Sequence, residues 1–333
     1  MYLVYAVTVT TNGGSAARED TKTKAITWNN LLSWDKTFGD HNINLLAGHE
    51  FYSRNLSFMR TSGDGIMMIG KYEVNSTTRD WRGQSYNDNY ALLSFFGRAE
   101  YNFLNRYYLS GSVRSDGSSR FHPDQRWGSF FSFGASWRLS QETFLSDISW
   151  LNNLSLRGSY GTSGNDNVGV LYAYQEYYKP YSLYGQPGYR KETNAAEELH
   201  WEKNKQINVA IDFTVFKRLS GSIEYYTRNS EGLLASKEIP LSANAGAATV
   251  NTNLGDIVNR GFEFSVSLAA IETKDFRWTV NANFTTLHNE ITSMASGDYI
   301  YDSYRSKMKR ATGRTLFEHF LPKTAGVNPI TDG

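Results

Sequence analysis

Alternation of apolar and polar residues is clearest between Phe95 and Arg114. One set of alternate positions is apolar or small, and the residues between them are mostly polar or charged. The first set comprises Phe95, Gly97, Ala99, Tyr101, Phe103, Tyr107, Leu109, Gly111 and Val113. Because successive side chains of a strand point to opposite faces, this period of two predicts two strands that share an apolar face. The connection at 104–106 is short and predicts antiparallel pairing.

The same alternation recurs along the chain and predicts further strands. It appears at 26–34, 43–47, 131–137, 154–160, 207–215, 223–225, 262–268 and 278–284. The segments 54–93, 115–126, 162–200 and 229–256 lack it and are mostly rich in small polar residues, so we expect loops there. The connector at 139–153 has the pattern of one helical turn, and 289–333 has no strong pattern.

The predicted connections alternate between short and long, which distinguishes two kinds of β-protein. Short ones fall near 35–41, 104–106, 139–153, 217–219 and 271–276. Hairpins that are tight at one end and long-looped at the other are typical of outer-membrane barrels, whereas soluble sandwiches space their turns more evenly. Aromatic residues near the short connections fit a girdle at one membrane interface: Trp34, Phe103, Tyr107, Trp137, Trp150 and Trp278.

We therefore predict an all-β fold: an antiparallel up-and-down transmembrane β-barrel segment of about ten strands from a larger barrel. The apolar face would contact outer-membrane lipid and the polar face would line the lumen. The alternative from the same pattern is a soluble carbohydrate-binding β-sandwich, in which the polar face would be the outer one.

Composition narrows the classes of function. The 34 basic and 33 acidic residues give a net charge of +1, which implies no nucleic-acid partner. Aromatic residues make up 15% of the chain while the mean hydropathy is −0.50, as expected when every second strand residue faces water. No apolar run approaches the eighteen or so residues of a membrane helix. Cysteine is absent, so neither disulfides nor thiolate metal sites contribute.

Two partial motifs do not support catalysis or a cofactor. The run from Gly65 to Tyr72 is similar to a phosphate-binding loop, but Tyr72 stands where Ser or Thr must ligate Mg²⁺. His49-Glu50 begins like a zinc-protease motif, but Ser53 occupies the place of the second histidine. The other histidines are scattered without ligand spacing. We expect neither an enzyme nor a cofactor or metal site.

Several segments resemble the SusC/RagA family of TonB-dependent outer-membrane transporters. They match in order over most of 25–333. The segments are Arg114-Ser-Asp-Gly-Ser-Ser-Arg-Phe121, Trp137-Arg-Leu-Ser-Gln-Glu-Thr-Phe144, 154–165, Leu199-His-Trp-Glu-Lys-Asn-Lys-Gln-Ile-Asn208, 253–263 and 325–333. The resemblance implies a 22-stranded barrel in the cell outer membrane that imports oligosaccharides or peptides.

The resemblance also implies partners and a domain boundary. A SusD-like surface lipoprotein would cap the barrel, and the TonB complex would act through an amino-terminal part. We expect residues 1–333 to be part of the barrel domain alone, without the signal peptide, plug, TonB box and carboxy-terminal strands of the family. A non-functional gene fragment is a further alternative.

Aromatic residues of the expected loops are the candidate substrate contacts. A flat ring with a polar tip suits stacking on sugars or holding peptides, although loop packing would use the same residues. The candidates are Trp81, Tyr86, Tyr172, Tyr174, Tyr177, Tyr178, Tyr181 and Tyr184. Charges on the polar faces are expected mainly to balance one another across strands in a solvated lumen: Arg98, Arg138, Arg157, Glu100, Asp212, Glu224 and Glu263.

Overall fold

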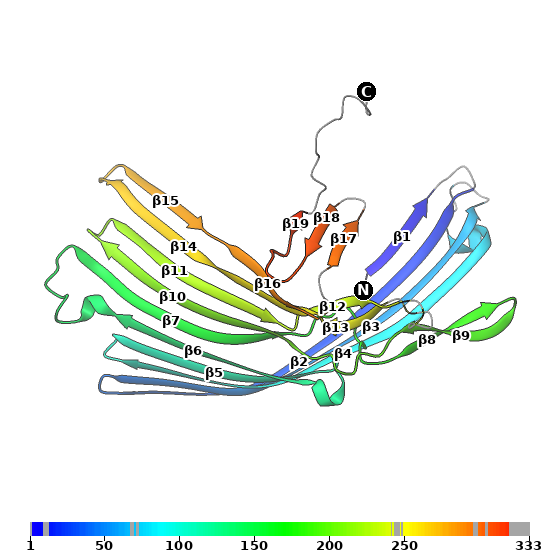
Figure 1. Cartoon of the computed structure of the whole chain (residues 1–333), viewed down its shortest axis with the longest axis horizontal. Coiled ribbons are helices and arrows are strands. Elements are labelled where there is room, and N and C mark those ends of the chain that lie inside the picture. The colour runs from blue at the N-terminus through cyan, green and yellow to red at the C-terminus, as the bar shows by residue number, and fades with distance from the viewer. Residues whose placement is uncertain are drawn as a thin grey trace, which may run out of the picture.

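The computed structural model describes residues 2–8, 13–66, 70, 73–240, 242, 247, 249–295, 299–303 and 306–319. The resembling segment 325–333 lies outside them. Within this part of the chain, one twelve-stranded antiparallel sheet curves into an open trough (Figure 1). Its strands are β1 (Tyr2–Thr8), β2 (Ser15–Phe38), β3 (His41–Ile66), β4 (Thr77–Phe103), β5 (Tyr107–Ser118), β6 (Trp127–Arg138), β7 (Leu151–Asn165), β10 (Glu202–Val215), β11 (Leu219–Glu231), β14 (Gly255–Glu272), β15 (Arg277–Thr285) and β16 (His288–Met294).

Neighbours in the sequence are neighbours in this sheet, apart from short inserted hairpins and from β16, which follows β15 but pairs with β14. The order is β1-β2-β3-β4-β5-β6-β7-β10-β11-β14-β15, with β16 pairing the first part of β14. Three smaller sheets contain β8 (Tyr177–Leu183) with β9 (Gln186–Thr193), β12 (Leu234–Glu238) with β13 (Thr249–Asn253), and β17 (Tyr299–Ser303) with β18 (Ser306–Arg310) and β19 (Glu318–His319). The up-and-down barrel topology predicted from the alternation is confirmed.

The described part of the chain includes three complete short 3₁₀ turns and no longer helix. They are η1 (Val74–Ser76), η2 (Pro123–Gln125) and η3 (Leu139–Gln141). The last of these confirms the helical turn predicted within 139–153. None of the described helices has the length and apolar character needed to cross a membrane.

The short connections gather at one end of the sheet, as predicted (Figure 1). The turn after β4 shows how the chain reverses so tightly: Leu104 and Asn105 both adopt φ of 54°, and the amide of Arg106 donates to the carbonyl of Phe103. Two central residues with positive φ match the right-handed twist of the flanking strands. The connection after β6 is fastened by Glu142, which accepts hydrogen bonds from Tyr107 (2.6 Å) and Trp137 (3.0 Å).

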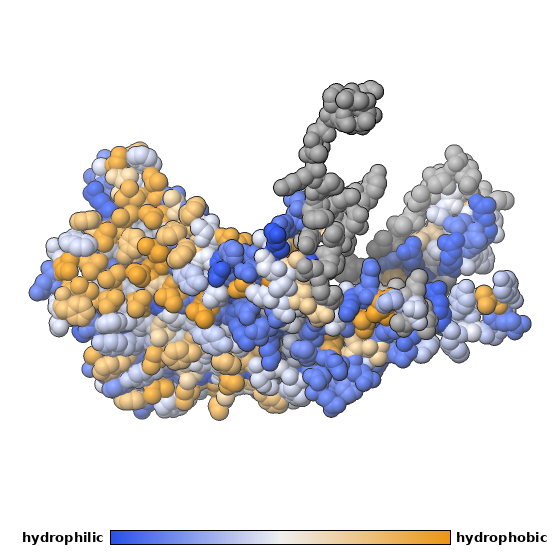
Figure 2. All heavy atoms as spheres, in the orientation of Figure 1, coloured by the Kyte–Doolittle hydropathy of each residue, from blue (hydrophilic) through white to orange (hydrophobic). Residues whose placement is uncertain are grey.

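Two rows of aromatic residues bound the outward apolar face. At the short-turn end a row crosses five strands through Phe38, His41, Phe103, Tyr107 and Trp137, whose successive ring centroids lie 4.7–6.2 Å apart. About ten residues further along the strands, Trp28, Phe51 and Trp127 lie in a second register row. This separation is the length that a tilted strand needs to cross a bilayer. The apolar surface near the short turns is visible in Figure 2.

Exposure of this face shows that the sandwich alternative is wrong. In a sandwich a second sheet would bury the apolar side chains. Here Phe95, Val113 and Phe133 are each more than half exposed on the outward face. The sheet therefore presents them to lipid.

The prediction of a loop at 54–93 is wrong. β3 continues to Ile66 and β4 begins at Thr77, so most of the segment forms a long hairpin. Sequence alternation fails there because both faces lie beyond the second aromatic row and meet water. Smaller corrections apply at 115–126, where β5 continues to Ser118, and at 162–200 and 229–256, which contain the β8–β9 and β12–β13 hairpins.

Candidate functional site

Aromatic side chains line the inner face of the long β3–β4 hairpin above the membrane band. Phe58 and Tyr86 stack with ring centroids 4.8 Å apart, and Tyr52 lies 5.9 Å from Tyr90. These side chains lie on the same face of the sheet as Arg98 and Glu100, charged residues of the lumen face, because residues two apart in a β-strand point the same way. We call Tyr52, Phe58, Tyr86 and Tyr90, together with Tyr177, the inner aromatic surface.

Tyr177 joins this surface from the β8 strand. Its ring centroid lies 6.0 Å from that of Tyr172, whose hydroxyl accepts a hydrogen bond from the amide of Asn89 on β4 (2.7 Å). Burial of the Tyr177 hydroxyl, reinforced by Tyr172, Tyr174 and Asp88 around it, raises the pKa of Tyr177. Asp88 lies on the same face of β4 as Tyr86, so the start of β8 lies beside the inner aromatic surface.

A polar network fixes the loop after β7 to the wall. One carboxylate oxygen of Asp166 accepts hydrogen bonds from the hydroxyls of Tyr90 (2.8 Å) and Ser118 (2.6 Å). The guanidinium of Arg120 lies 4.9 Å from the centre of the Tyr90 ring and donates to the carbonyl of Asp166 (3.1 Å) and to Asn167 (2.7 Å). Charged hydrogen bonds in a partly buried site are stronger than neutral ones. This network therefore orders the loop after β5 and the loop after β7.

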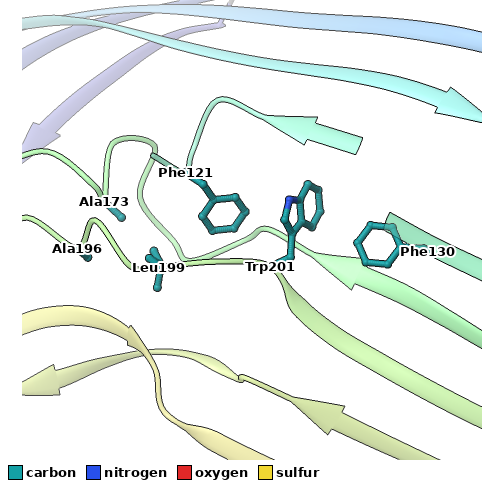
Figure 3. Close-up of a cluster of buried hydrophobic side chains, with 6 residues drawn as sticks. All are labelled: Phe121, Phe130, Ala173, Ala196, Leu199 and Trp201. Carbon is teal, nitrogen blue, oxygen red and sulfur yellow. The ribbon is translucent and has the colours of Figure 1, made fainter. Parts of the chain in front are cut away.

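A small hydrophobic core holds the same loops together (Figure 3). Phe121 is fully buried, and its ring lies 5.5 Å from the indole of Trp201, which also contacts Phe130 at 5.5 Å. The Trp201 indole N–H donates to the carbonyl of Arg126 (2.8 Å). The loop core comprises Phe121, Phe130, Ala173, Ala196, Leu199 and Trp201. It lies on the inward side of the sheet, because a Cβ at Gly128, on the lumen face of β6, would collide with Trp201.

The structure thus separates the eight candidates into groups. Tyr86, Tyr172 and Tyr177 lie on or beside the inner aromatic surface. Tyr174 is close to Tyr177, to which Gln175 links it by hydrogen bonds, and its ring also lies edge-on to His122 at 6.1 Å. Trp81 is 69% exposed near the far end of the β3–β4 hairpin, where its indole donates to the carbonyl of Thr77.

The other three candidates lie on the β8–β9 hairpin, which extends away from the wall (Figure 1). Tyr178 donates to Glu176, and Tyr181 lies under the guanidinium of Arg190 at 5.5 Å. Tyr184 is 96% exposed at the tip. No ring contact or hydrogen bond joins these three side chains to the inner aromatic surface in the described residues, so they form a separate group.

Residues that organise the site were missed by the sequence analysis. Arg120, Phe121, Asp166 and Trp201 all lie in the motifs that carry the family resemblance, or next to them. The resembling segments therefore marked these residues as notable. Their role could not be predicted, because they join loops that lie about 80 residues apart in the chain, as with Phe121 and Trp201.

Some of the charges expected on the polar face are paired, whereas Glu263 lies opposite Glu224 and Arg138 bonds to uncharged oxygens of Asn105 and Tyr108. Arg157 on β7 donates to Asp212 on β10 (2.9 Å) and to Glu224 on β11 (2.7 Å), so one cation joins three strands. Arg98 pairs with Glu100 on its own strand. Within the described residues no three His, Cys, Asp or Glu side chains group closely enough to hold a metal ion.

Comparison with known proteins identifies the family. The family model described as TonB dependent receptor-like, beta-barrel matches residues 2–322. The chain belongs to this family of TonB-dependent receptor barrels. Its members lie in the outer membrane and are not enzymes, so the apolar band of this chain spans the outer membrane.

Individual TonB-dependent receptors share a substantial part of the sequence. The chain is 34% identical over 282 residues to the receptor SusC of Bacteroides thetaiotaomicron, covering 82% of this chain and 28% of SusC. It is 30% identical to receptor P39 of Formosa agariphila, covering 81% and 26%. The RagAB peptide importer in its closed-closed state superposes with a TM-score of 0.84 at 25% identity, covering 96% of this chain and 35% of that chain. The chain thus spans between a quarter and a third of the length of the curated receptors.

The charge pairs of the β8–β9 hairpin predict a pH response. Hydrogen bonds from Lys191 and then Tyr178 lower the pKa of Glu176 below 4.5. Because the folded-state pKa lies below the unfolded one, the pairing stabilises the hairpin above about pH 4.5 and is lost as the pH falls through the folded value. We expect hydrogen-exchange protection of β8 and β9 in a complete receptor, meaning a full-length barrel that contains this segment, to decrease between pH 6 and pH 3.

A matched variant isolates this effect. Glu176→Gln removes the titrating group, so the pH-dependent part of the protection should shrink. Equal protection at pH 6 and pH 3 in the unsubstituted receptor, after correction for intrinsic exchange rates, would contradict the prediction.

Proposed function

We propose that this chain supplies part of the wall and external loops of a TonB-dependent importer of oligosaccharides or peptides. The observation that carries the proposal is the inner aromatic surface, which lies above the membrane band on the lumen face. Rings with polar tips bind sugars or peptides by stacking and hydrogen bonding. The similarity of this chain to the receptor SusC and to the RagAB peptide importer supports nutrient import.

The proposal includes two partners. A SusD-like surface lipoprotein closes the loop end, where the β8–β9 hairpin extends outward with Tyr178, Tyr181 and Tyr184 exposed. The TonB complex supplies energy through a plug that belongs to the complete receptor. The barrel described here contributes a stable wall and a polar lumen to this process.

Substrate contact is tested by removing rings from the inner aromatic surface. In the complete receptor, Tyr86→Ala together with Tyr177→Ala should weaken binding of the imported ligand about fivefold or more, because each stacking contact contributes roughly 0.5–1.5 kcal/mol. Barrel yield should be unchanged, since both side chains are partly exposed and lie outside the loop core. Isothermal titration calorimetry with purified receptor measures the affinity.

Tyr189→Ala is the control, because Tyr189 is 80% exposed on β9 and lies outside the candidate set. Unchanged affinity in the double variant would assign these tyrosines to loop packing. TonB-dependent uptake by cells that express the complete receptor tests the import function itself. Absence of any uptake of oligosaccharides or peptides would contradict the import function. Sequencing of both flanks of the coding region tests the gene-fragment alternative independently.

A further inference from the structure

The upper part of β4 has an unpaired edge. β3 pairs with β4 along nearly its whole length, from Phe103 to Thr77. On the other side, β5 pairs with β4 only from Leu92 to Phe103, because β5 ends at Ser118 and the chain turns into the loop core. Above Leu92, β4 is therefore an edge strand within the part of the chain that the structure describes.

The direction of the free groups follows from two contacts at the base of this edge. The amide of Ala91 donates to the Ser119 hydroxyl (2.9 Å), and its carbonyl accepts from the Ser119 amide (3.0 Å). The amide of Asn89 donates to the hydroxyl of Tyr172 (2.7 Å). Because backbone groups of alternate residues point the same way, those of Gly83, Ser85 and Asn87 also point away from β3.

These three residues leave three amide donors and three carbonyl acceptors without a partner among the described residues, and all three residues are exposed. Natural edge strands are usually protected by Lys, Pro or a bulge. This stretch has Gly and Ser at its centre instead. The register shift of the β3–β4 pairing is a bulge on β4 between Arg79 and Arg82, where Asp80 has φ of 54°, and it lies beyond Gly83. The edge is therefore open to a further strand.

We propose that this edge binds an extended peptide of the imported substrate by β-strand addition. The inference rests on the proposed import function and narrows the substrate class to peptides, because a glycan has no amide ladder to pair with the strand. Its location favours a substrate over a strand of the lipoprotein partner: Tyr86 follows Ser85 on the inner face, and Tyr177 lies at the base of the edge. Main-chain pairing would accept many peptide sequences, which suits an importer.

A proline at an outward amide tests the proposal. Ser85→Pro removes a donor that β3 does not use, and proline is tolerated on edge strands at such positions. In the complete receptor, this variant should bind an acetylated, amidated octapeptide of alternating Thr and Gln at least about fivefold more weakly, since one hydrogen bond is lost and the ring obstructs the incoming strand. Fluorescence anisotropy with a labelled peptide measures the affinity.

Two controls separate main-chain pairing from other effects. Ser85→Ala keeps the amide and should leave peptide affinity unchanged. A peptide N-methylated at every residue cannot donate to the edge and should bind the unsubstituted receptor more weakly than the parent peptide. Equal binding of the parent peptide to the Ser85→Pro variant and the unsubstituted receptor would overturn the proposal.

The remaining outcomes distinguish this inference from the import function. If cells import a peptide equally well with Ser85→Pro, or import only oligosaccharides, strand addition by peptides is wrong and import stands. If Ser85→Pro releases the lipoprotein while peptide binding is unchanged, the edge belongs to the partner and the proposal is overturned. If no ligand is imported by the unsubstituted receptor, the proposed function fails as well.

Discussion

Val113→Arg should lower the unfolding free energy of the complete receptor by about 2–4 kcal/mol, the cost of an arginine on the lipid face near the bilayer midplane. Val113 lies on β5 between the two aromatic rows and is 58% exposed on the outward face. Its neighbours across the strands are Gly97 and Phe131. No acidic side chain lies opposite it to pair with a guanidinium, so the charge would face hydrocarbon.

Ser110→Arg on the same strand is the matched control. Ser110 faces the lumen and lies directly opposite Glu100, which can pair with the new cation, so the unfolding free energy should change little. Urea unfolding and refolding in lipid vesicles measures both variants. If Ser110→Arg were as destabilising as Val113→Arg, the assignment of the two faces would be wrong at this strand.

Phe121→Ala should separate the external loops from one another while leaving the barrel folded. Deletion of a fully buried phenylalanine costs about 3–5 kcal/mol. The loss falls on a core of only six buried residues, which Phe121 shares with Trp201. Strand pairing in the membrane band does not depend on these contacts. We therefore expect local unfolding of 118–126 and 166–201.

Limited proteolysis of the complete receptor detects this change. Cleavage within 166–201 should accelerate by at least about tenfold, while the heat-modified mobility of the barrel on gels stays the same. Tyr184→Ala is the control, because Tyr184 is 96% exposed and packs against nothing. Unchanged cleavage in Phe121→Ala would show that the Asp166 network alone holds the loops.

Sequence alternation predicted the hairpins of the membrane band because lipid and lumen make opposite demands on successive residues. Trp28, Leu32 and Trp34 on β2 are apolar for this reason, as are Phe262, Phe264 and Val266 on β14. Beyond the second aromatic row both faces meet water. The run Arg82-Gly-Gln-Ser-Tyr-Asn-Asp-Asn-Tyr90 therefore has no apolar face, and its strand was predicted as a loop.

The site was harder to predict because it depends on contacts distant in the sequence. Tyrosines were recognisable as candidate contacts from the sequence. Only the fold shows that Tyr177 lies beside the inner face of β4, which carries Tyr86, whereas Tyr184 extends away from the wall. Phe121 gave no local sign of burial, since its partner Trp201 lies in another loop. Likewise, the hydrogen bond from Tyr90 to Asp166 joins residues that are 76 positions apart in the sequence.

The unequal height of the wall has a consequence for the shape of molecules that can enter. β2, β3 and β4 have 24 to 27 residues, whereas β5 and β6 have 12 each and end beneath the inward-packed loop core. In the proposed importer, the tall β2–β4 part of the wall would therefore stand beside the lower loop core, and a ligand would have to pass to one side of that core. A stiff ligand would meet the loop core end-on, whereas a flexible chain could lie along β2–β4 and bend past the loop core. Selection would then act on the flexibility of the cargo before any of its functional groups are recognised.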